Sequence, residues 1–65
     1  MLDEDVADLV RQLCSRAGII MEDVSVISLT AKVADVASAR KVTAQLRAAA
    51  ERIGALANAA EALMD

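Results

Sequence analysis

Residues 39–63 read ARKVTAQLRAAAERIGALANAAEAL and contain the longest regular pattern in the chain. Apolar residues recur in it at alternating spacings of three and four, the pattern of a helix with one continuous apolar stripe. No proline interrupts it, and its commonest residue is alanine, the strongest helix former. The pattern predicts a long C-terminal helix from about Val36 or Ala39 to Leu63. The stripe consists of Ala39, Val42, Leu46, Ala49, Ile53, Leu56, Ala60 and Leu63.

The positions beside this stripe carry fewer charges than those of an exposed coiled coil. They are Thr43, Ala50 and Ala57 on one side and Gln45, Arg52 and Ala59 on the other. The apolar surface is therefore wider than a zipper seam, and a chain of 65 residues has little else to cover it. This surplus favours self-association through a two-fold interface. The predicted interface residues are Val42, Leu46, Ala49, Ile53, Leu56, Ala60 and Leu63.

A second helical pattern occupies residues 4–17, where apolar side chains recur on one face. Asp3 stands at the N-cap position, and the acidic first turn suits the positive end of the helix dipole. Gly18 stands where a left-handed residue commonly ends a helix. These signals predict a helix that stops at Gly18. Its apolar face consists of Val6, Leu9, Val10, Leu13, Cys14 and Ala17.

Residues 19–35 fit two structures. Residues 27–33 alternate apolar and polar side chains and are rich in β-branched residues, as a half-buried strand would be. They also fit a helix, because two neighbouring stripes recur at helical spacing. These stripes are Val26, Leu29, Val33 and Val36, and Val24, Ile27, Ala31 and Ala34.

A lone strand would need a partner strand from another chain, whereas a helix satisfies its own backbone. We therefore predict a second helix from about Met21 to Ala34. The resulting fold is an all-α, three-helix arrangement with a long Ala-rich C-terminal helix. The alternative is an α-β-α chain that pairs with another copy through a strand at residues 24–33.

The composition argues against most catalytic and metal chemistry. The chain has no His, so it lacks the commonest general acid or base and the commonest transition-metal ligand. A single cysteine, Cys14, forms neither an intramolecular disulfide nor a multi-thiolate metal site. We interpret Cys14 as a small buried hydrophobe, with a redox role as the alternative. Since no catalytic or phosphate-binding motif is present, we expect no enzyme activity and no cofactor.

The charges are distributed unevenly along the chain. The net charge is −3, but residues 1–23 sum to −4 and residues 40–52 sum to +3. The acidic start at residues 1–5 differs from the basic start of a targeting signal. No apolar run approaches the roughly 20 residues that span a membrane. We expect one cytoplasmic domain, residues 1–65, with no membrane contact.

Three functions are compatible with these patterns. The leading hypothesis is a small helical protein–protein interaction module that forms a homo-oligomer or binds a helical partner. The alternative is a dimeric nucleic-acid-binding regulator, which the negative net charge and the absence of aromatic residues disfavour. A third is an adaptor that folds only on a larger partner. The regulator would face phosphates with Arg40, Lys41, Arg47 and Arg52.

Overall fold

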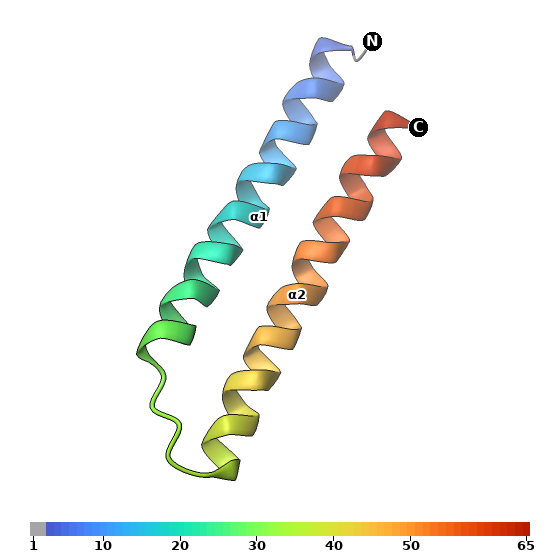
Figure 1. Cartoon of the computed structure of the whole chain (residues 1–65). Helices are drawn as coiled ribbons and strands as arrows, with labels where there is room; N and C mark the ends of the chain where they lie inside the picture. Colours follow the sequence, from blue (N-terminus) through green and yellow to red (C-terminus); the bar gives the residue numbers. More distant parts are fainter. Residues whose placement is uncertain (1–2) are drawn as a thin grey trace.

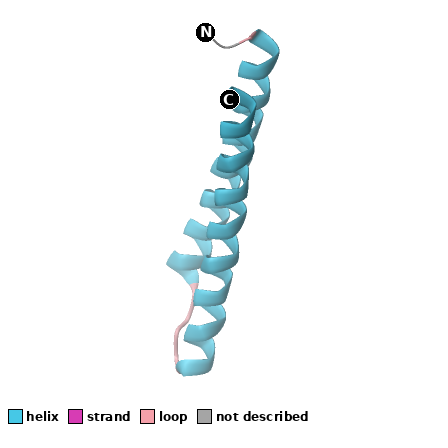
Figure 2. Cartoon of the chain, turned by 90° about the vertical axis from the view of Figure 1, so that its right-hand side faces the viewer, coloured by secondary structure: helices cyan, strands magenta, loops and turns pink. Residues whose placement is uncertain are grey.

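The computed structural model describes residues 3–65 as two helices joined by a short loop, α1 (Glu4–Thr30) and α2 (Val36–Met64). The helices run antiparallel and side by side as a hairpin (Figure 1). The hairpin is long and thin, with principal-axis extents of 51 × 17 × 11 Å (Figure 2). No strand occurs within residues 3–65. Met1 and Leu2, where the expected acidic start begins, lie outside the described residues.

The all-α class is confirmed, but the three-helix arrangement is wrong because α1 continues through Gly18 to Thr30. Gly18 has no positive φ and therefore does not act as a left-handed cap. A helical glycine costs about 1 kcal/mol relative to alanine. Packing along α2 on both sides of Gly18 outweighs that cost. The predicted helix from Met21 to Ala34 is mostly the second half of α1.

The alternative strand at residues 24–33 is also wrong. Residues 24–30 are helical, and residues 31–33 belong to the loop. The local alternation of apolar and polar residues therefore did not determine the backbone conformation. Helical packing against α2 uses Val24, Ile27 and Ala31, which are half-buried, whereas the neighbouring stripe remains exposed. Leu29, in that exposed stripe, is 84% accessible to solvent.

Side-chain caps fix both helix starts. Asp3 accepts a hydrogen bond from the backbone N–H of Asp5 at 3.0 Å. At the loop, the backbone N–H of Ser38 donates to Asp35 Oδ1 at 2.7 Å, and the backbone N–H of Asp35 donates to Ser38 Oγ at 3.1 Å. This reciprocal pair is a capping box. The N–H of Ser38 beside the carboxylate holds the pKa of Asp35 below its ordinary value.

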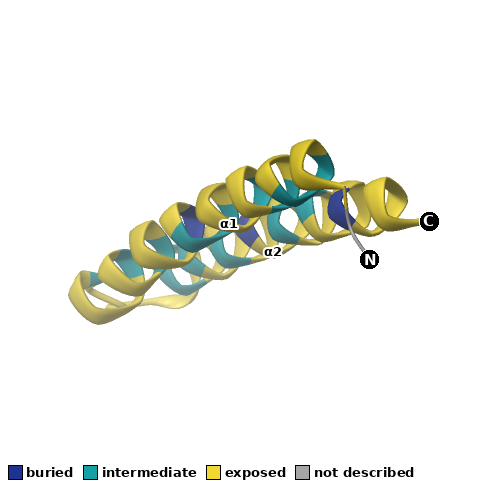
Figure 3. Ribbon diagram, turned by 90° about the horizontal axis from the view of Figure 1, so that it is seen from above, coloured by how far each residue is buried: buried dark blue, intermediate teal, exposed yellow. Residues whose placement is uncertain are grey.

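Each helix directs one apolar stripe toward the other, and the buried residues lie between the helices (Figure 3). The α1 stripe keeps the alternating spacing of three and four residues through Gly18, and every member is buried or half-buried. It consists of Val6, Val10, Leu13, Ala17, Ile20, Val24, Ile27 and Ala31. The α2 stripe is the one predicted from the sequence. In the described part of the chain, only Ile20, Ala49 and Ala60 are buried.

Candidate self-association surface

The predicted interface residues of α2 form the seam between the two helices of one chain. Ala49 and Ala60 are buried there, and Val42, Leu46, Ile53 and Leu56 are half-buried. Leu63, at the open end of the hairpin, is 38% exposed. The seam residues therefore stabilise the hairpin within one chain. A broad face lies on either side of the seam, and both faces expose apolar side chains.

One broad face carries no charge, and we call it the charge-free face. It consists of the heptad positions on one side of each seam stripe, namely Ala7, Cys14, Met21 and Ser28 on α1 and Thr43, Ala50, Ala57 and Met64 on α2. An apolar groove runs along its middle, lined by Leu13, Cys14, Ala17, Met21, Ile53, Leu56, Ala57 and Ala60. Every residue that lines this groove is uncharged. The face is thus suited to exclusion of water.

Two expectations are corrected on this face. Cys14 is exposed and not buried, because it stands beside the seam stripe and not within it. Met21 is 53% exposed and does not begin a helix, since it lies in the interior of α1. Both side chains border the groove. The polar Thr43 hydroxyl donates to the backbone oxygen of Arg40 at 3.0 Å, so covering it leaves no donor without a partner.

The opposite broad face, which we call the charged face, mixes apolar and ionised residues. A hollow on it is lined by Arg16, Ile19, Ile20, Asp23, Arg52, Ala55 and Leu56. A second hollow nearer the loop shares Ile20, Asp23 and Arg52 and adds Gln45. Ile19 is 59% exposed there. This face therefore also exposes apolar surface, but covering it would desolvate three ionised side chains.

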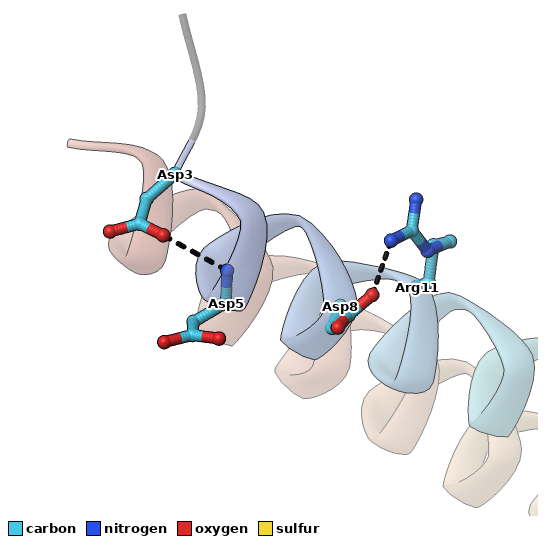
Figure 4. Close-up of polar contacts among 4 residues, drawn as sticks. All are labelled: Asp3, Asp5, Asp8 and Arg11. Carbon is cyan, nitrogen blue, oxygen red and sulfur yellow. Dashed lines mark hydrogen bonds and ion pairs between the residues drawn. The ribbon is translucent and has the colours of Figure 1, made fainter.

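The four basic residues singled out from the sequence are all exposed, but they border different faces. By helical position, Arg40 and Arg47 flank the charge-free face, whereas Arg52 lies on the charged face and Lys41 flanks it. Within residues 3–65 no ion pair joins them to the acidic residues of α1. In residues 3–65 the only ion pair joins Arg11 to Asp8 within α1 (Figure 4). The hairpin does not gather the four cations into a single patch.

The acidic residues at the start of α1 serve the helix itself. Asp3 caps the helix, and Asp8 pairs with Arg11, as Figure 4 shows. No group of three metal-ligating side chains lies together within residues 3–65. Neither helix of the described chain has an apolar stretch long enough to cross a membrane.

Comparisons with known proteins assign no family. No family model matches the sequence, and neither the curated proteins nor the solved structures contain a match. The surface of the hairpin therefore provides the evidence on function.

Sequence reasoning found half of the charge-free face. The uncharged positions Thr43, Ala50 and Ala57 were recognised beside the α2 stripe, but their counterparts on α1 were missed. Cys14 was assigned to the apolar face of a helix at residues 4–17 and Met21 to the start of a second helix, so the two were not placed at one flanking position. The signal that reveals them is the unbroken spacing from Val6 to Ala31, which places Cys14 and Met21 at the same flanking position.

Proposed function

We propose that this chain is a small helical protein–protein interaction module that associates with a second copy of itself. The observation that carries the proposal is its exposed area. The hairpin has an accessible surface of 5145 Å². A compact monomer of 6.8 kDa exposes about 4,000 Å² by the usual scaling of surface with mass. The surplus is about 1,200 Å² per chain.

This surplus is sufficient for a stable interface. Standard protein–protein interfaces bury about 800 Å² on each partner. Two hairpins packed together would form a four-helix bundle, in which each helix gains a second neighbour. A two-helix hairpin alone leaves most of each helix in water, and no described side chain of this one is fully buried. Association would supply the core that the single chain lacks.

The test is sedimentation equilibrium combined with far-UV circular dichroism on the same sample. Absorbance at the peptide bond is the detection signal because the chain has no Trp or Tyr. We expect a helical dimer whose thermal midpoint falls on dilution, since association and folding are coupled. A helical monomer with a midpoint that stays constant over a hundredfold dilution would contradict the proposal. An unfolded monomer would also contradict it and would favour a larger folding partner.

A further inference from the structure

We infer that the second copy docks on the charge-free face, so that the two grooves face each other across a two-fold axis. This inference rests on the proposed self-association and adds the face that mediates it. The Cα extents of 51 × 17 × 11 Å show that the hairpin has two broad faces and two narrow edges. The rectangle that encloses the Cα atoms of one broad face measures 51 × 17 Å, or about 870 Å², so the face is large enough for the roughly 800 Å² that each partner of a standard interface buries.

Desolvation selects between the two broad faces. Covering the charged face would remove Arg16, Asp23 and Arg52 from water, and a desolvated charge is costly unless it is paired. None of these three residues has an ion-pair partner within the described hairpin. Covering the charge-free face removes only alanine, cysteine, methionine, serine and threonine side chains from water, together with the apolar groove lining. For the same buried area, covering the charge-free face therefore removes much less hydration than covering the charged face.

The border of the charge-free face favours an identical partner. The positions just outside it carry both signs of charge, with Glu4 and Arg11 on α1 and Arg40, Arg47 and Glu61 on α2. A border of one sign would repel its own copy, whereas a mixed border allows opposite charges to meet at the rim. An anionic partner such as a nucleic acid would find no uniformly positive border here.

Cys14 is a native probe of this arrangement because it is the only thiol and lies on the charge-free face. The experiment measures the rate of Cys14 alkylation by iodoacetamide as the chain is diluted from the dimer range to the monomer range. The control is the double variant Cys14→Ser/Ala59→Cys, which moves the thiol to the charged face at an exposed alanine of α2. Sedimentation equilibrium on both proteins gives the dimer fraction at each concentration.

We expect alkylation of Cys14 to be at least tenfold slower in the dimer than in the monomer, because the partner covers the thiol. The thiol at position 59 should react at the same rate at every concentration. A bulky maleimide attached to Cys14 should also abolish dimer formation, whereas the same group at position 59 should not.

The outcomes separate the two proposals. If the chain dimerises but Cys14 remains reactive, the assigned face is wrong while self-association stands. Protection of position 59 in place of Cys14 would assign the interface to the charged face. If the wild-type chain is monomeric throughout, both the proposed function and the assigned face are overturned.

Discussion

The two broad faces of the hairpin are built by the same helices and flank the same seam, but they differ in the free-energy cost of removing their side chains from water. The charged face exposes more large aliphatic groups, including Leu9 and Ile19, but places ionised residues among them. The charge-free face exposes smaller side chains with no ionised group between them. The amount of apolar surface therefore does not identify an interface by itself. The cost of removing neighbouring charges from water decides which apolar surface can be covered.

A charge introduced into the charge-free face should weaken self-association more than any other change considered. Ala57→Glu places a charge in the apolar groove, where a docked partner would bury it without an ion-pair partner. We expect the dimer dissociation constant to rise by about 100-fold or more, equivalent to about 3 kcal/mol. Ala59→Glu, two residues away on the charged face, is the matched control with the same effect on helix propensity. Sedimentation equilibrium measures both, and equal weakening by the two variants would remove the distinction between the faces.

Substitutions in the seam and on the charged face should differ in how much they lower the free energy of unfolding. Ile20 is 9% exposed and packs between the helices, whereas the adjacent Ile19 points to the charged face. We expect Ile20→Ala to lower the free energy of unfolding by about 2–4 kcal/mol because it opens a cavity. We expect Ile19→Ala to change it by less than about 0.5 kcal/mol, as for other exposed positions. Urea unfolding followed by circular dichroism measures both, and a large loss with Ile19→Ala would indicate a partner on the charged face.

Replacing Gly54 should change the stability of the chain by a smaller amount. A Cβ atom added at this position meets no other atom within 4 Å. We therefore expect Gly54→Ala to stabilise the chain by about 1 kcal/mol through helix propensity alone, read as a higher thermal midpoint. A lower midpoint would instead show that a second chain approaches the border of the charge-free face closely at Gly54.

The smallest effect concerns pH and is common to both faces, because the loop cap supports the hairpin as a whole. The folded pKa of Asp35 lies below its unfolded value, so its contribution is complete above the unfolded pKa and is lost as the pH falls through the folded one. We expect a small decrease in thermal midpoint below about pH 4. Asp35→Asn keeps the cap but has no titrating group, so this component should be absent from its pH profile. Identical profiles for the two proteins would contradict this role of Asp35.

The sequence predicted α2 well because nearly every signal there agrees, with Gly54 as the exception. Helix propensity, spacing and capping residues all indicate a helix that begins near Val36, and the predicted stripe is the one that faces α1. The prediction failed at Gly18 and at residues 24–33, where local signals conflict with long-range packing. A glycine and a β-branched run are weak local preferences. The α2 stripe is a continuous apolar surface. Packing against it keeps α1 helical through Gly18 and through residues 24–30. The division of α1 at Gly18 placed Met21 at a helix start, and Cys14 was interpreted as buried because its position was counted within the apolar stripe and not beside it.

The capped loop has a consequence for how the hairpin closes. Near the loop, Ile27 and Gln45 border one hollow, whereas at the other end Leu9 and Leu63 border another although nearly the whole chain separates them. The entropy lost on closing a chain segment grows with its length, so contacts near the loop form at the lower entropic cost. Contacts between the two helices should therefore form first near the loop and last at the open end. The loop also acts as a tether that gives each helix a high effective concentration of the other. Cleavage between Ala31 and Asp35 would convert this intramolecular pairing into a bimolecular one, and helix content would then depend on peptide concentration.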